Sequence, residues 1–132
     1  MYLYMVCCSE SEPEGRMLSP KDSCKAWESA DKLRKVVFSR CYTDMGILSK
    51  ETAEICLTGR LLDPEEMPTA APEETILRGG EDALIVAGCA FLEQLLKHLG
   101  IGRYGLGERL CPGSCCAICV SEGKAVVPGG KL

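Results

Sequence analysis

The sequence predicts a mainly α-helical domain with a few short strands, an α+β fold, and three observations lead to this expectation. The first is an uncharged run, Ala83–Phe91, which continues into a leucine-rich segment. The second is Ser19-Pro20, a pair typical of the first residues of a helix. The third is the apolar opening MYLYMV, which is long enough for one short strand.

The central element is predicted to be a helix from Asp82 to Leu99. Its first half carries no charge, and a helix that is apolar on every side belongs inside a core. Glu81 and Asp82 would lie at the positive end of the helix dipole, and Gly100 supplies a left-handed stop. Its second half has leucines on one stripe: Leu92, Leu95, Leu96 and Leu99.

The remaining elements are expected to pack around this helix. A second long helix should run from Pro20 to about Ser39 and form the main contact with the central one. Ser49 is expected to cap a helix over Lys50–Leu57, and Asp63-Pro64-Glu65-Glu66 has the pattern of a capping box. One more helical turn is expected over residues 73–78, and a short strand over residues 125–127.

These elements divide the chain into two parts. Residues 1–18 would form a strand and an acidic linker, and residues 19–132 a single helical domain. The net charge of −4 argues against a nucleic-acid partner, because phosphate backbones need a basic surface. The chain has no apolar run of about 18 residues and no export signal at its start, so we expect a cytoplasmic protein outside the membrane, with its ten cysteines reduced.

The densest chemical signal is a group of cysteines near the carboxyl end. Cys111, Cys116 and Cys119 have the Cys-x4-Cys-x2-Cys spacing that binds a plant-type [2Fe–2S] cluster. The segments FLEQLLKHLGI before the group and VSEGKAVV after it resemble the iron–sulfur subunit of molybdenum hydroxylases. That resemblance implies an electron-transfer module.

Two other readings of these cysteines remain open. No fourth cysteine follows Cys119, so the three thiols could be buried as small apolar residues. With Cys115 they could also bind zinc or form a redox disulfide. We expect Cys111, Cys116 and Cys119 to be free thiols, with no cofactor bound.

A second resemblance covers residues 46–113, through GILSKETAEI, LLDPEEM, EDALIVAGCAFLEQLLKHLGI and GERLCPG. These segments are similar to the carboxy-terminal half of the exopolyphosphatase/guanosine pentaphosphate phosphatase family. The matching positions are Gly46, Leu48, Ser49, Glu65, Glu66, Asp82, Ile85, Gly88, Leu92, Gly100, Ile101, Glu108, Arg109 and Gly113.

This resemblance implies a partial lobe of an actin/RNase H-like fold that works on phosphates with a divalent metal. The two glycine-rich phosphate loops of that fold are not recognisable in MYLYMVCCSESE or FSRCYTDMG. We therefore expect no catalytic residues and no catalysis by the isolated chain. A second copy or a complementary lobe would be the partner.

Three further residues are weaker candidates. Arg103 and Arg109 flank a glycine-rich segment and could bind an anion, although surface arginines are common. His98 is the single histidine and should face solvent on the central helix, with no nucleophile beside it in sequence.

Overall fold

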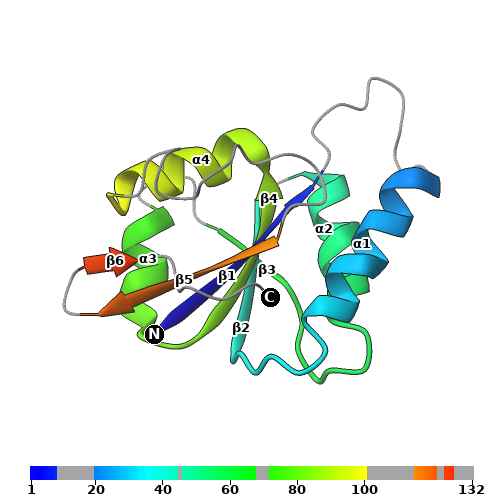
Figure 1. Cartoon of the computed structure of the whole chain (residues 1–132), viewed down its shortest axis with the longest axis horizontal. Coiled ribbons are helices and arrows are strands. Elements are labelled where there is room, and N and C mark those ends of the chain that lie inside the picture. Colours follow the sequence, from blue (N-terminus) through cyan, green and yellow to red (C-terminus); the bar gives the residue numbers. More distant parts are fainter. Residues whose placement is uncertain (9–19, 45, 68–71, 101–114, 122–123, 127–132) are drawn as a thin grey trace.

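The computed structural model describes residues 1–8, 20–44, 46–67, 72–100, 115–121 and 124–126. Within these ranges the chain forms three layers, with a mixed sheet between two pairs of helices (Figure 1). The strands are β1 (Tyr2–Cys8), β2 (Arg40–Thr43), β3 (Glu65–Glu66), β4 (Ala83–Gly88), β5 (Cys115–Ser121) and β6 (Lys124–Val126). The helices are α1 (Pro20–Lys32), α2 (Ile47–Cys56), α3 (Pro72–Gly79) and α4 (Cys89–His98).

The sheet has six strands in the described part of the chain, in the order β3-β2-β4-β1-β5-β6. Neighbouring strands from β3 to β1 are parallel, and β5 and β6 are antiparallel to their neighbours. The expected fold class was wrong, because the chain is an α/β fold built on this sheet and neither mainly α nor a lobe of the actin type. The amino-terminal strand is confirmed, and it lies between β4 and β5 in the same sheet as the remaining strands.

The largest error of the sequence interpretation concerns the central helix. Residues Ala83–Gly88 form strand β4, and the helix begins only at Cys89. All six residues of β4 are buried. A strand in the middle of a parallel sheet is covered on both faces and therefore reads as a continuous apolar run, as a buried helix does.

Alternation along the strands divides the core into two clusters. On β4, Ala83, Ile85 and Ala87 face α3 and α4, whereas Leu84 and Val86 face α1 and α2. The leucine stripe of α4 is confirmed as its inner face, with Leu92, Leu95 and Leu96 buried. α4 therefore covers the sheet, and it does not pack on α1 as expected.

Other boundaries also differ from the prediction. α1 begins at Pro20 as predicted but ends at Lys32, and Val36, Val37 and Phe38 then lead into β2. Glu65-Glu66 forms β3 instead of a helix start. The predicted turn after residue 72 is confirmed as α3, and the strand near residue 125 as β6. In the described ranges, no helix is both long and apolar enough to cross a bilayer.

Replacing Leu92 with Ala tests the packing of α4 on the sheet. Leu92 has no exposed surface, so its truncation should lower the free energy of unfolding by about 2–5 kcal/mol. Lys97 is exposed on the same helix, and its change to Ala should cost less than about 0.5 kcal/mol. Urea titrations of the two variants measure both values, and equal losses would contradict the described face of α4.

Candidate functional site: the carboxyl edge of the parallel strands

Three parallel strands end at the same edge of the sheet, and two helices begin there. Cys8 at the end of β1 pairs with Gly88 at the end of β4, and β2 ends beside them at Thr43. Gly46 is the N-cap of α2 and Gly88 is the N-cap of α4. Ligands of open α/β sheets bind outside the carboxyl ends of the strands, so this edge is the first place to look for a site.

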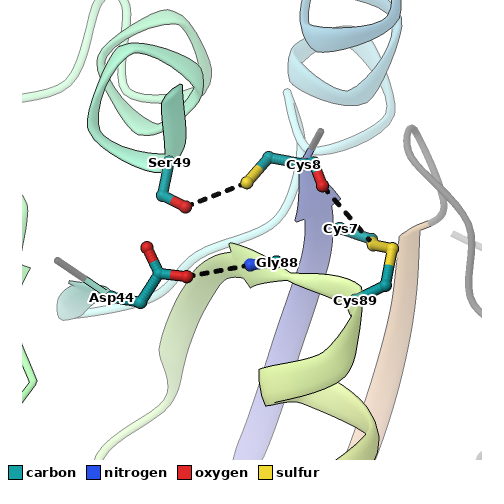
Figure 2. Close-up of a disulfide and its surroundings, with 6 residues drawn as sticks. All are labelled: Cys7, Cys8, Asp44, Ser49, Gly88 and Cys89. Atoms are coloured by element: carbon teal, nitrogen blue, oxygen red, sulfur yellow. Dashed lines mark hydrogen bonds between the residues drawn. A yellow bond between two sulfur atoms is a disulfide. The ribbon is translucent and has the colours of Figure 1, made fainter. Parts of the chain in front are cut away.

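Asp44 joins the two helix starts. One carboxylate oxygen, Oδ1, accepts a hydrogen bond of 2.9 Å from the backbone N–H of Gly46. The other, Oδ2, accepts one of 3.0 Å from the N–H of Gly88 (Figure 2). Neither glycine has a side chain to cap its helix, and the amino ends of helices carry partial positive charge. A carboxylate of the chain itself therefore occupies the position that suits an anion.

A thiol and a hydroxyl lie at the same edge. The Sγ of Cys8 and the Oγ of Ser49 are 2.9 Å apart, and both side chains are buried (Figure 2). Ser49 belongs to the first turn of α2, so it comes to Cys8 from the face of the sheet that α2 covers. The pair supplies two groups that could act as nucleophiles.

The third feature of the edge is a disulfide. Cys7, near the end of β1, is bonded to Cys89, the first residue of α4, and their Cα atoms are 5.3 Å apart. The expectation that all cysteines are reduced thiols was therefore wrong for this pair. Sequence reasoning did not connect the two residues, because Cys89 was assigned to the middle of a helix and Cys7 to a separate short strand at the amino terminus.

The single histidine of the chain is far from this edge. His98 is the last residue of α4, is exposed, and lies at the opposite end of that helix from Cys89. A rise of 1.5 Å per residue places it roughly 14 Å along the axis from the start of α4. No imidazole can reach the carboxyl edge without rearrangement of this helix.

The iron–sulfur interpretation is corrected by β5. Cys116 and Cys119 belong to this strand and are free thiols, and Cys111 lies outside the described residues. Side chains three positions apart on a strand point to opposite faces, so Cys116 and Cys119 cannot surround one cluster from a loop. The described residues contain no group of three or more side chains suited to a metal ion. Arg103 and Arg109, the predicted anion-binding residues, also lie outside the described ranges.

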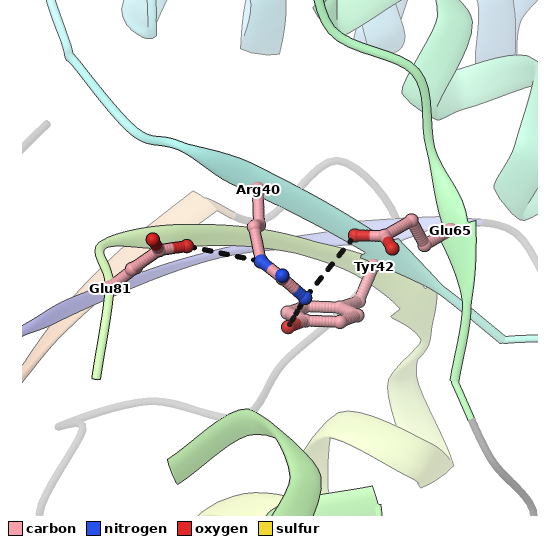
Figure 3. Close-up of polar contacts among 4 residues, drawn as sticks. All are labelled: Arg40, Tyr42, Glu65 and Glu81. Carbon is pink, nitrogen blue, oxygen red and sulfur yellow. Dashed lines mark hydrogen bonds and ion pairs between the residues drawn. The ribbon is translucent and has the colours of Figure 1, made fainter. Parts of the chain in front are cut away.

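A second polar cluster surrounds Arg40 on β2 (Figure 3). Its Nε donates a hydrogen bond of 3.0 Å to Glu81, and its Nη1 donates one of 3.2 Å to the hydroxyl of Tyr42. The same Nη1 lies 3.8 Å from a carboxylate oxygen of Glu65. These half-exposed contacts tie β2 to β3 and to the residues before β4. We assign this cluster a structural role, because its guanidinium already faces two carboxylates.

A hollow of about 910 Å³ lies between α1 and the carboxyl end of α2, and Trp27, Ile55 and Arg60 contribute to its lining. α2 starts at the carboxyl edge of the sheet, so this hollow belongs to the other end of the molecule. Its position separates it from the cluster around Asp44.

The architecture corresponds to that of known phosphatases. An α-ribazole phosphatase from Shigella flexneri superposes with a TM-score of 0.77 and 15% identity, covering 97% of this chain and 95% of that chain. The protein histidine phosphatase SixA, in complex with tungstate, gives 0.75 and 13%, covering 97% and 94%. The chain has the fold of these phosphatases. The sequence itself matches no protein-family model and no curated protein.

A further structure with this fold carries a bound substrate-like ligand. It is a histidine-to-alanine mutant of a phosphoserine phosphatase from Entamoeba histolytica with phosphoserine, at a TM-score of 0.69 and 12% identity, covering 96% of this chain and 94% of that chain. These likenesses overturn the resemblance to the exopolyphosphatase family. Several of its matched positions, such as Leu48 and Leu92, are apolar residues that any buried helix needs, and Ile85 lies on a strand.

Sequence reasoning missed Asp44 and Cys8 as site residues. The available signal was an acidic residue between a short apolar segment, Cys41–Thr43, and a glycine that opens a helix. A strand followed by such a residue places a carboxylate at the edge of a sheet. The signal could not be used because the parallel sheet itself had not been recognised.

Buried and half-buried thiols outside this edge should make the stability of the fold sensitive to alkaline pH. Burial raises the pKa of Cys41, Cys56 and Cys116 from 9.0 to about 12. Between these values the unfolded chain loses thiol protons that the folded chain keeps. The free energy of unfolding should therefore fall as the pH rises above about 9, by about 1.4 kcal/mol per pH unit for each thiol.

Urea titrations between pH 8 and 11 measure this slope. Changing Cys41 to Ala should make this slope shallower, because the change removes one of the thiols whose pKa burial raises. Equal slopes for the parent chain and the Cys41 variant would show that the Cys41 thiol ionises as readily in the folded protein as in the unfolded one.

Proposed function

We propose that the carboxyl edge binds the phosphate group of a phosphorylated ligand between the starts of α2 and α4, without histidine-dependent hydrolysis. The observation that carries this proposal is the position of the Asp44 carboxylate, which accepts N–H groups from both helix starts. Backbone N–H groups at helix amino termini bind phosphates and carboxylates alike. Asp44 thus takes the place of the anionic ligand.

The fold supports the same class of ligand. The structural neighbours include phosphatases with tungstate and with phosphoserine bound. Tungstate is a tetrahedral oxyanion of the shape of phosphate. A ligand of this kind would have to displace the carboxylate of Asp44, because two anions cannot share the same donors at contact distance.

Hydrolysis through a phosphorylated histidine is not compatible with the described geometry. The nucleophilic imidazole of such a mechanism must lie within bonding distance of the phosphorus atom, and His98 is at the far end of α4. We therefore propose binding as the function. We also propose a cytoplasmic location, which is supported by the seven cysteines outside the disulfide among the described residues, since thiols persist in reducing compartments.

Neutralising Asp44 tests the proposed site. Because like charges at contact distance in a protein repel by about 4 kcal/mol, Asp44→Asn should bind tungstate at least about tenfold more tightly than the parent chain. Isothermal titration calorimetry measures both affinities. Asp31→Asn is the matched control, since Asp31 is an exposed carboxylate on α1 that pairs with Arg34, and it should leave the affinity unchanged.

Thermal melts show whether the Asp44 variant keeps its fold, and the asparagine oxygen can still accept one of the two N–H groups. Equal affinities of the parent chain and the Asp44 variant, or no binding by either, would refute the oxyanion site.

A second candidate function is phosphate-ester hydrolysis with Cys8 as the nucleophile. It is favoured by the contact of Cys8 with Ser49 at the carboxyl edge of the parallel strands. It ranks second because the Cys8 side chain is buried, so a phosphate ester could reach its sulfur only after a local rearrangement of the edge.

Hydrolysis of p-nitrophenyl phosphate separates the two candidates. We expect release of p-nitrophenol at the rate of the buffer alone, with the parent chain and with Cys8→Ser. A rate that increases with protein concentration and is lost in Cys8→Ser, but kept in Cys24→Ser, would promote the second candidate.

A further inference from the structure

The disulfide between Cys7 and Cys89 links two segments that are already held together. β1 pairs with the whole length of β4, from Leu3 opposite Ala83 to Cys8 opposite Gly88. Cys89 follows this ladder directly and starts α4 (Figure 2). The covalent bond therefore joins segments that hydrogen bonds already hold together. It differs in this respect from a disulfide that fixes an otherwise unattached loop to the core.

The two sulfurs of this pair differ in access and in electrostatic environment. Cys89 is partly exposed and is the first residue of α4, where the helix dipole favours a thiolate. Cys7 is 1% exposed and packs against the core beneath α4. Cys89 is therefore the more accessible residue of the pair, and an incoming reagent should attack Cys89 before Cys7.

Neighbouring thiols are protonated or face away from this pair. Cys116 packs against the same core cluster as Cys7, but burial raises the pKa of its thiol to about 12. Cys8 is adjacent to Cys7 in sequence, but it points to the opposite face of the sheet, where it contacts Ser49. Cys41 and Cys56 are buried on that same face, and burial raises the pKa of both thiols to about 12. They are therefore protonated and unreactive at neutral pH.

We propose that Cys7 and Cys89 form a reversible dithiol–disulfide site that exchanges with low-molecular-weight thiols and disulfides. The inference does not depend on the proposed phosphate site. It rests on the placement of one accessible sulfur at a helix start and one buried sulfur behind it.

Oxidation proceeds in two exchange steps. The thiolate of Cys89 attacks a low-molecular-weight disulfide, forms a mixed disulfide and releases one thiolate. Cys7 then attacks the sulfur of Cys89, and its proton passes to the second small thiolate as that group leaves, so that it departs as a thiol. Two protein thiols are oxidised and one small disulfide is reduced to two thiols, and an excess of the small thiol drives the same steps in reverse.

Equilibration of the full chain in glutathione buffers of varied ratio tests this site. Acid quenching and alkylation with N-ethylmaleimide in denaturant, followed by peptide mass spectrometry, identify the cysteines that change, including the buried Cys7. We expect the disulfide to convert to two thiols per chain as reduced glutathione increases, with both changes in the peptides of Cys7 and Cys89. A pair that stays oxidised, or stays reduced, at every ratio would overturn the proposal.

Single variants test the order of the steps. In Cys7→Ser, oxidised glutathione should leave one glutathione attached to Cys89, because the resolving thiol has been removed. In Cys89→Ser, Cys7 should remain unmodified, and Cys41→Ala should exchange as the parent chain does. Glutathione on Cys7 in Cys89→Ser, or no glutathione on Cys89 in Cys7→Ser, would overturn the assigned roles. The thiol content of the parent chain tests the site independently of both variants.

Discussion

The parallel pairing of β1 with β4 is the constraint on which the rest of the structure depends. It joins residues about 80 positions apart and places Cys8 opposite Gly88. The same strand β4 pairs with β2 on its other side, so three carboxyl ends meet at one edge. The disulfide and the bridge through Asp44 both lie there, because the strands deliver their last residues to the same place. Loss of this register by one position would turn each inward side chain to the opposite face.

Asp44 shows how a helix start can be satisfied by a residue from outside the helix. Both helices at the edge begin with a glycine N-cap, so neither helix has a side-chain cap. A single carboxylate from the loop after β2 accepts from both. This arrangement holds α2 and α4 in fixed relation, although the two helices cover opposite faces of the sheet. The proposed anion site and this internal contact would therefore use the same N–H donors.

The likeness to phosphatases is a likeness of architecture. Identities of 12–15% accompany a superposition that covers almost the whole chain. The groups that the chain brings to the carboxyl edge are a carboxylate, a hydroxyl and cysteine sulfurs, with the histidine elsewhere. Chemistry depends on the side chains placed on a fold and not on the fold itself. The disulfide and the Cys8 thiol at this edge therefore come from the cysteines of this chain, and the architecture alone does not imply them.

Local patterns in the sequence determined the elements that depend on neighbours along the chain. The strand at the amino terminus, the start of α1 at Pro20 and the buried leucine face of α4 follow from short-range periodicity and capping. The nature of Ala83–Gly88 was decided by tertiary structure, since an uncharged apolar run suits a buried strand and a buried helix equally well. The site was decided in the same way. Asp44, Cys7 and Cys89 have no common motif in the sequence, and they meet because hydrogen bonds between distant strands, which no local pattern records, bring three strand ends together.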